Sequence, residues 1–306
     1  MNSQRPLQIL VLLYVAAVVV GVISIFHPGA GKSGARKPGA LAIVHISGLI
    51  STKMSASPFE RSDADEIARR IHKLSEDDNV KAILLRINSP GGTVGAVQEI
   101  DTELQRCRKK GKIIVASLAD VAASGGYYLA SSADVIVANP GTITGSIGVI
   151  LEFGNLQGLM QKLGVKLEVI KSGAHKDIGS PARELTPEER RLLQASITDA
   201  YEQFLQAVAL GRHQPEDKIR PLADGRIFTG RQAQQVGLVD RLGDQEDAIE
   251  IAIALAHLPE HPQIISDDTR SLGAILQHLS SEAPSGAWQA VAASWSHSPS
   301  VEYRWQ

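Results

Sequence analysis

The stretch KIIVASLADVAASGGYYLAS, residues 112–131, sets an apolar run before a turn of small residues and a second apolar segment. The same order occurs earlier in KAILLRINSPGGT, residues 81–93. Short apolar runs bounded by glycine turns are typical of buried strands. Strands that alternate with helical patterns indicate an α/β fold with a parallel sheet of βαβ units.

The rest of the chain between residues 41 and 258 continues this alternation. The longest helix is predicted to open at Thr186, because Thr186, Pro187 and Glu189 form a capping box with proline at the first helical position. Gly211 is a natural stop for it. Strands are expected at 41–46, 81–88, 112–118, 134–138 and 167–170, and helices at 63–74, 96–109, 186–211 and 245–258.

Composition excludes several classes of protein. The chain has 306 residues, enough for one large or two small domains, and a formal net charge of −2, which gives no electrostatic case for a nucleic-acid binder. A single cysteine excludes an internal disulfide and a zinc site built from cysteines. The charge is unevenly spread, since residues 1–40 hold four bases and no acid, which leaves a net charge of −6 on the remainder.

The N-terminal part predicts a membrane anchor. Residues 7–26 are almost entirely apolar, and a helix of that length matches a hydrocarbon core of about 30 Å. A cleaved signal peptide is the alternative, but its apolar region would be shorter and followed by small residues. Residues 1–6 would form a short tail and 27–40 a flexible tether. The positive charges after the span do not favour export of the C-terminal part.

The last part of the chain, residues 259–306, is rich in serine, histidine and alanine, and contains all three tryptophans of the sequence. We expect a poorly ordered tail. The alternative is an amphipathic or docking segment, because exposed tryptophan is costly to leave unused.

Two glycine-rich turns are candidates for chemistry. Ser124 follows the strand at 112–118 within Ala-Ala-Ser-Gly-Gly, so its hydroxyl could act as a nucleophile with nearby N–H groups to stabilise an oxyanion. The structural alternative is that Ser124 only caps the following helix. The sequence also departs from the G-x-S-x-G pattern of hydrolases, because Ala122 stands at the position of the first glycine. The Pro-Gly-Gly turn at 90–92 is either an anion-holding turn or a structural one.

A nucleophilic serine needs a base. His175 is the histidine whose loop could approach the turn, and Lys176 lies beside it. A lysine can act as general base when burial lowers its pKa, and Ser–Lys pairs are an established variant of the catalytic triad. Most loop lysines are solvated, however, and spacing along the chain cannot pair Lys176 with Ser124.

Five blocks of sequence add a family resemblance. The blocks are NSPGG (88–92), ADVAASGGYYLASSAD (119–134), GTITGSIGV (141–149), SGAHKDIGSPARELTPEE (172–189) and GRIFTGRQAQQVGLVD (225–240). In this order they resemble the signal peptide peptidase A family of membrane-anchored serine proteases, in its short form. The resemblance covers roughly residues 41–258 and implies the ClpP/crotonase-like fold.

The resemblance also implies roles for residues of this chain. Ser124 would be the nucleophile, Lys176 the general base, and Ser146 a hydrogen-bond partner of the lysine. The oxyanion donors would be Gly91 or Gly92, together with Gly125. No metal and no cofactor is implied.

Partners and location follow from the same resemblance. It implies a ring-like homo-oligomer, an octamer, in which one subunit supplies both dyad residues or borrows one from its neighbour. Substrates would be apolar, extended peptides such as cleaved signal peptides, held along a strand edge near the Pro-Gly-Gly turn. The catalytic domain would face the outer side of a bacterial inner membrane. Two other functions stay open, namely a crotonase-fold enzyme acting on acyl-thioesters and a non-catalytic membrane scaffold.

Overall fold

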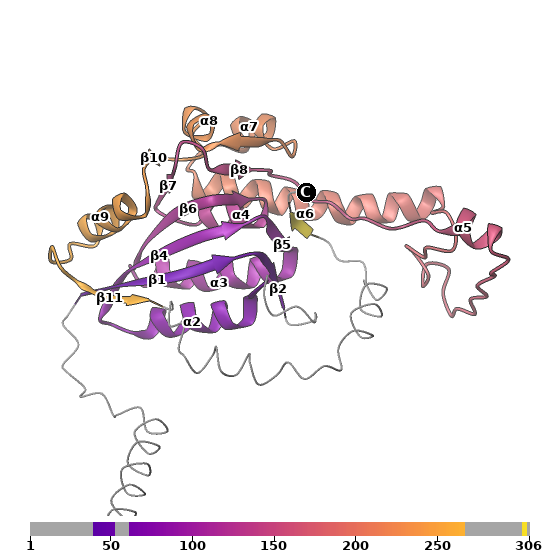
Figure 1. The fold of residues 1–306 in the computed structure, drawn as a ribbon, viewed down its shortest axis with the longest axis horizontal. Coiled ribbons are helices and arrows are strands. Elements are labelled where there is room, and N and C mark those ends of the chain that lie inside the picture. The colour runs from indigo at the N-terminus through magenta and orange to yellow at the C-terminus, as the bar shows by residue number, and fades with distance from the viewer. Residues whose placement is uncertain (1–38, 53–60, 267–301, 305–306) are drawn as a thin grey trace, which may run out of the picture. The chain divides into compact units, whose positions relative to one another are not determined.

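The computed structural model describes residues 39–52, 61–266 and 302–304, and within this part the chain forms a mixed α/β fold around a largely parallel sheet (Figure 1). The eight-stranded sheet has the order β10-β7-β6-β4-β1-β11, with β8 on β6 and β9 on β8. The pair β8–β9 is antiparallel, and the other pairs of this sheet are parallel. Its strands are β1 (Ala40–Ser47), β4 (Val80–Ser89), β6 (Ile113–Ala123), β7 (Val135–Ala138), β8 (Ile143–Gly145), β9 (Ile227–Thr229), β10 (Arg241–Leu242) and β11 (Gln263–Ser266).

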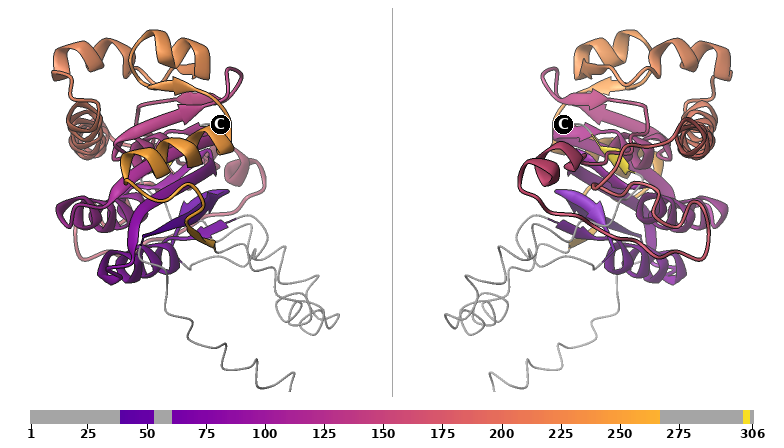
Figure 2. Two further views of the ribbon diagram at one scale, coloured as in Figure 1. Left: turned by 90° about the vertical axis from the view of Figure 1, so that its left-hand side faces the viewer. Right: turned by 90° about the vertical axis from the view of Figure 1, so that its right-hand side faces the viewer.

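The two faces of this sheet are buried by different helices. Alternate residues of β4 show the division, since Ile83 and Leu85 pack in the cluster that contains residues of α2, α3, α4 and α6. Leu84 lies in the second cluster, with Ala248 and Ile249 of α9. In Figure 2, α9 (orange) is set apart from α2 and α3 (indigo). Burial on both faces explains why the central strands are near-continuous apolar runs.

The helices begin where the sequence provides caps. Thr186 and Glu189 form the predicted capping box of α6, and Pro187 is its first residue. Asp63 caps α2, whose Ile67, Ile71 and Leu74 are buried. The helices are α2 (Ala64–Glu76), α3 (Val94–Lys109), α4 (Gly125–Ser131), α5 (Gln157–Lys162), α6 (Pro187–Gly211), α7 (Glu216–Ile219), α8 (Gly230–Gln235) and α9 (Gln245–Leu255), with a 3₁₀ turn at Arg220–Leu222.

A second, small sheet lies beside the first and has the order β12-β5-β2-β3. Its strands β2 (Leu49–Ser51), β3 (Arg61–Asp63) and β5 (Gly91–Thr93) are parallel neighbours, and β12 (Glu302–Arg304) pairs antiparallel with β5. The register sets residue 303 opposite Gly92. The end of the described chain is therefore hydrogen-bonded to the Pro-Gly-Gly turn.

Residues 151–190, here called the arm, extend beyond the sheet and carry α5 and the start of α6 (Figure 1). Within the arm only Glu189 is buried. The predicted strand at 167–170 is wrong, since these residues form no strand and are exposed. An apolar run needs a neighbouring strand to become a sheet edge, and the described chain pairs no strand with this one.

The predicted anchor at 7–26, with the tail and tether around it, lies outside the described residues. No helix among the described residues is both long and apolar enough to cross a bilayer. The strands β11 and β12 fall within 259–306, and the remainder of that segment lies outside the described residues.

Candidate active site

Ser124 stands at a sharp turn from strand to helix, between Ala123 and Gly125, here called the elbow. The strand β6 continues five residues past its predicted end and stops at Ala123, and α4 begins at Gly125. The flanking strands hold this end in register, with Ala122 opposite Ser89 and Ala123 opposite Gly145. Ser124 itself has φ 54° and ψ −118°, a conformation that costs a non-glycine residue about 1–3 kcal/mol.

The backbone of Ser124 is fully bonded, whereas its hydroxyl is not. Its N–H donates to the carbonyl of Gly145 at 2.8 Å, and its carbonyl accepts from Tyr128 N–H at 2.8 Å. The side chain is buried, and within the described chain Oγ has no hydrogen-bond partner. Ser124 occupies the N-cap position of α4 but makes no capping bond through its side chain. A buried hydroxyl without a partner costs about 1–3 kcal/mol, so capping does not account for this serine.

The Pro-Gly-Gly turn lies next to this elbow, because β4 ends at Ser89 opposite Ala122. Ser89 Oγ donates to the carbonyl of Gly48 at 2.6 Å and accepts from Gly91 N–H at 3.1 Å. A Cβ at Gly92 would lie 1.8 Å from the carbonyl oxygen of Ile50. The close approach of β2 and β5 therefore requires glycine at position 92.

Ser146 lies on the other side of the elbow. It follows Gly145, the residue paired with Ala123, and has φ 50°. Its N–H donates to the carbonyl of Arg226 at 2.8 Å, and it is 6% exposed. A cavity of about 530 Å³ opens here, lined among others by Ser146, Tyr201 and Asp224. The structure thus brings Ser124, Ser146 and the glycine turn to one end of the sheet.

The predicted base does not join them within one chain. Lys176 lies in the arm and is exposed, and within the described residues its side chain makes no hydrogen bond or ion pair. Neighbouring His175 is also exposed and faces Glu188, with Nε2 and Oε1 3.8 Å apart. No hydrogen bond in the described chain connects either side chain to Ser124.

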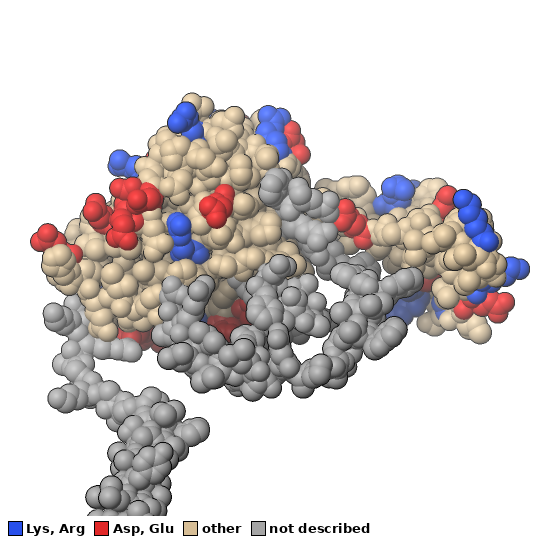
Figure 3. All heavy atoms as spheres, in the orientation of Figure 1, with Lys and Arg blue, Asp and Glu red and all other residues tan. Residues whose placement is uncertain are grey.

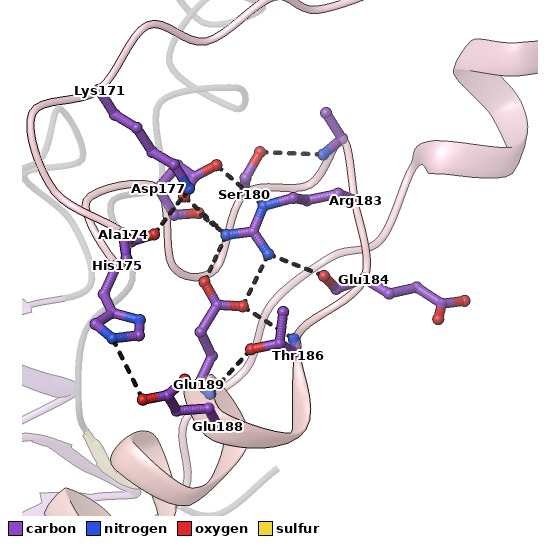
Figure 4. A network of polar contacts seen from close by, with 11 residues as sticks. Lys171, Ala174, His175, Asp177, Ser180, Arg183, Glu184, Thr186, Glu188 and Glu189 are labelled. Carbon is purple, nitrogen blue, oxygen red and sulfur yellow. Dashed lines mark hydrogen bonds and ion pairs between the residues drawn. The ribbon is translucent and has the colours of Figure 1, made fainter.

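The loop that carries Lys176 is closed by a network of charges around Arg183 (Figure 4). Arg183 makes paired contacts to the carboxylates of Asp177 and Glu189, at distances of 2.6–3.0 Å. Lys171 Nζ donates to Asp177 Oδ1 at 2.6 Å and to the carbonyl of Ala174 at 2.8 Å.

These contacts shift the pKa values of the acids. Hydrogen bonds from Arg183 and then Lys171 hold the pKa of Asp177 far below its usual range. Hydrogen bonds from Arg183 and from the Thr186 backbone lower the pKa of Glu189 to about 2.

Sequence reasoning missed this network, although the residues stand in a quoted block. The available signal was the alternation of acids and bases over 171–189, with Asp177, Arg183 and Glu189 six residues apart. Spacing of six has no fixed meaning in a loop, so the contacts could not be read from it.

The described residues hold no cluster of potential metal ligands, and their thiol, Cys107, is buried. They contain no group of three or more His, Cys, Asp or Glu side chains that could hold a metal ion. Cys107 is buried on α3, and burial raises the pKa of its thiol to about 11, which makes it unreactive near neutral pH.

The fold and the elbow together define a class. A buried serine in a strained strand-to-helix turn, next to a glycine turn at the end of a parallel sheet, is the arrangement of a serine hydrolase.

Comparison with known proteins narrows this class. Residues 106–258 match Peptidase family S49, and residues 47–139 match Clp protease. The chain belongs to peptidase family S49, the family of signal peptide peptidase A, and is by class a serine protease. The ClpP-like fold expected from the resemblance is confirmed at this level.

Three relatives illustrate the relationship. "Putative protease slr0021" of Synechocystis is 54% identical over 61% of this chain and 67% of its own length. "Putative signal peptide peptidase SppA" of Enterococcus faecium is 39% identical over 67% of this chain and 60% of its own. "Serine protease SPPA, chloroplastic" of Arabidopsis thaliana is 36% identical over 82% of this chain and 38% of its own. The chain thus spans between about two fifths and two thirds of these relatives.

Proposed function

We propose that this chain is a membrane-anchored serine endopeptidase that degrades apolar, extended peptides, with Ser124 as nucleophile and Lys176 as general base. The observation that carries the proposal is the state of Ser124, since its hydroxyl is buried without a partner while the surrounding backbone is fixed. A buried hydroxyl without a partner lowers the stability of the fold, so its presence is better explained by a role in a reaction than by packing.

The chemistry would run through an acyl-enzyme. A neutral Lys176 amine takes the proton of Ser124 as Oγ attacks a peptide carbonyl. The N–H groups of Gly92 and Gly125 hold the oxyanion, and Gly92 is preferred to Gly91 because Gly91 N–H already donates to Ser89 Oγ. The lysine ammonium then protonates the leaving amine, and water attacks the ester to release the second product and restore Ser124.

We infer that Lys176 reaches the Ser124 of a neighbouring copy in a homo-oligomeric ring. The arm carries apolar side chains that face water in the single chain, among them Leu163 at 68% and Ile170 at 103% exposure. Such a surface is costly unless a partner covers it. Docking of the arm on a neighbour would also remove the ammonium of its lysine from water, which favours the neutral amine.

Substrate would bind as a strand on β5. In the described chain this edge already takes an antiparallel strand, β12, opposite Gly91–Thr93. An extended peptide in the same place would run its backbone past the elbow, because β5 follows directly on the strand end that pairs with Ala122. The name of the Enterococcus relative, a signal peptide peptidase, supports cleaved signal peptides as one substrate.

The location is proposed from the apolar stretch at 7–26, which would anchor the chain in a bacterial inner membrane. The catalytic domain would then lie on the outer side, where released signal peptides gather. Protease added to intact spheroplasts should degrade the domain. Protection of the domain until the membrane is opened would contradict this orientation.

A fluorophosphonate probe tests the nucleophile. The wild type should be labelled at Ser124, Ser124→Ala should not be labelled, and Lys176→Ala should react about 10²–10⁴-fold more slowly, the range for loss of a general base. His175→Ala is the matched control and should behave as wild type. Peptide hydrolysis that persists in a folded Ser124→Ala protein would contradict Ser124 as nucleophile. A folded wild type that neither reacts with the probe nor hydrolyses peptides would favour an acyl-thioester enzyme or a scaffold.

Mixing two inactive variants tests the shared site. When Ser124→Ala and Lys176→Ala subunits are co-assembled, about a quarter of the interfaces in a head-to-tail ring pair an intact serine with an intact lysine. Activity should therefore return on mixing. Activity that stays at the level of the separate variants, in rings shown to be mixed, would place both residues of the dyad in one subunit.

A further inference from the structure

We propose that Arg183 is a positioning residue for Lys176, fixing the lysine loop and withdrawing the adjacent carboxylate of Asp177 from it. The inference rests on the proposed function, in which Lys176 is the base. Arg183 itself touches no reacting atom in this scheme.

Arg183 first closes the loop. Its Nε donates to Asp177 Oδ2 at 3.0 Å and its Nη2 to Oδ1 at 2.7 Å, so the guanidinium and carboxylate face each other as a fork. Nη2 also lies 3.3 Å from the backbone carbonyl of Asp177. Both the side chain and the backbone of the residue after Lys176 are thereby held. Paired contacts of this kind fix direction as well as distance.

Arg183 then fastens the closed loop to the start of α6. Nη1 donates to Glu189 Oε2 at 2.8 Å and to the carbonyl of Glu184 at 3.0 Å, and Nη2 donates to Glu189 Oε1 at 2.6 Å. Glu189 is the third helical residue, and its Oε2 also accepts from Thr186 N–H at 2.9 Å. The side chain of Glu189 is only 3% exposed. A single carboxylate therefore serves both the cap of α6 and the arginine.

The helix α6 connects this point with the elbow. Near its other end Phe204 packs on Tyr128 of α4 with ring centroids 5.1 Å apart. A Cβ at Gly211 would lie 1.8 Å from the carbonyl oxygen of Ser131, so the two helices approach as closely as backbones allow. Since α4 begins directly after Ser124, the continuous helix α6 connects the loop of Lys176 with the nucleophile of the same chain. In a symmetric ring this connection sets where each lysine meets the next serine.

The network also determines the charge around Lys176. Asp177 is next to it in sequence and would be its natural ion-pair partner, which would keep the lysine protonated. Both oxygens of Asp177 are instead engaged, Oδ2 by Arg183 and Oδ1 by Arg183 and Lys171. The ionisable groups around the loop are Lys171, His175, Asp177, Arg183, Glu184, Glu188 and Glu189. Among the described residues none of them forms an ion pair with Lys176.

Arg183→Met in the full-length, assembled protein tests the inference, with the rate of fluorophosphonate labelling measured across pH. Loss of the fork leaves Asp177 Oδ2 available to pair with Lys176, while Oδ1 keeps its contact with Lys171. We expect labelling to slow about tenfold or more, and its rise with pH to shift to higher pH. Arg183→Lys keeps the charge without the fork and should recover only part of the rate. Arg191→Met, at an exposed arginine of α6, is the control and should match the wild type.

Two combined variants make the outcome decisive. In a Lys176→Ala background, Arg183→Met should change the labelling rate no further, and an equal loss there would show a merely structural role. Asp177→Asn with Arg183→Met removes the freed carboxylate and should return the pH profile to its wild-type position. A profile that stays shifted would overturn the charge part of the proposal. If Lys176→Ala alone labels like wild type, the proposed base is wrong, whatever Arg183 does.

Discussion

The elbow of Ser124 and the loop of Lys176 differ in burial and in how their polar side chains are bonded. The elbow is buried among packed strands, has a strained backbone and leaves its hydroxyl without a partner. The loop is on the exposed arm, where both acidic and basic side chains reach the surface (Figure 3). The four charged side chains of the network around Arg183 are nevertheless paired with one another (Figure 4). The core can hold a strained, unsatisfied group because surrounding contacts overdetermine its position. The arm lacks such contacts, so ion pairs and a helix cap provide its order.

Each region also lacks a feature that a complete serine protease site needs. Among the described residues, no base is hydrogen-bonded to the hydroxyl of Ser124 at the elbow. The arm has a lysine, Lys176, that forms no ion pair with another described residue, and apolar side chains that are exposed. In the proposed ring, the lysine of one copy would supply the base for the serine of the next.

The largest effect should come from the apolar surface of the arm. Leu163→Glu with Ile170→Glu should lower peptide hydrolysis about 100-fold or more and reduce the oligomer to smaller species, because charges cannot be buried in an interface without partners. Sedimentation velocity and a peptide assay would measure this. Leu255→Glu, at an exposed position outside the arm, should change neither, and full activity of the arm variant would remove the case for a shared site.

Gly92→Ala should be the largest effect on stability. Its Cβ would overlap the carbonyl oxygen of Ile50, so β2 and β5 must separate, at a cost of about 1–3 kcal/mol. Urea unfolding would measure the loss. Gly95→Ala is a matched control on the next helix, where nothing lies within 4 Å of a new Cβ, and it should be neutral or slightly stabilising.

Ser124→Ala should be inactive and more stable. It removes a buried hydroxyl that has no partner, so the free energy of unfolding should rise by about 1 kcal/mol. Ser131→Ala should do the reverse, because Ser131 Oγ donates to the carbonyl of Tyr128 at 2.6 Å. The two alanine variants of one short helix thus differ in sign. Equal destabilisation of both would mean that Ser124 Oγ is satisfied in the folded protein.

The smallest effect concerns acid. Arg183 depresses the folded-state pKa of Glu189 to about 2, so its contribution to stability is complete above the unfolded pKa of about 4.3 and is lost as pH falls through the folded value. The difference in unfolding free energy between wild type and Glu189→Gln should be constant from about pH 7 to 5 and shrink below about pH 4. A difference that grows on acidification would contradict the pairing.

The sequence predicted the core of the fold well, because strands buried on both faces are continuous apolar runs and α6 has a full capping box. It misjudged segments whose structure depends on neighbours. The strand predicted to end at 118 reaches Ala123 because β4 and β8 pair with its end, and the run at 167–170 forms no strand. The three-residue strands β2 and β5 are too short to show a period.

In the candidate site, too, local features could be predicted from the sequence, whereas contacts between distant residues could not. Ser124 could be placed on its turn from local sequence, because a strand, small residues and a helix follow in order. The missing partner of its hydroxyl and the strain of its backbone arise from the folded arrangement, so they could not be predicted from the sequence. Local sequence makes Lys176 one candidate base, but only the resemblance pairs it with Ser124. The role of Arg183 depends on contacts across a loop that no periodicity describes.

Because β12 occupies the edge on which substrate is proposed to bind, it would change how activity depends on substrate concentration. A segment that belongs to the same chain as its binding edge competes with substrate at a local concentration that does not change with the amount of protein. Substrate would bind only in the fraction of molecules whose edge is vacant, and its apparent dissociation constant would rise by the inverse of that fraction. The concentration of peptide needed for half-maximal activity would then be higher than for a chain whose edge is vacant. A chain shortened after residue 300 should show a lower KM at unchanged kcat.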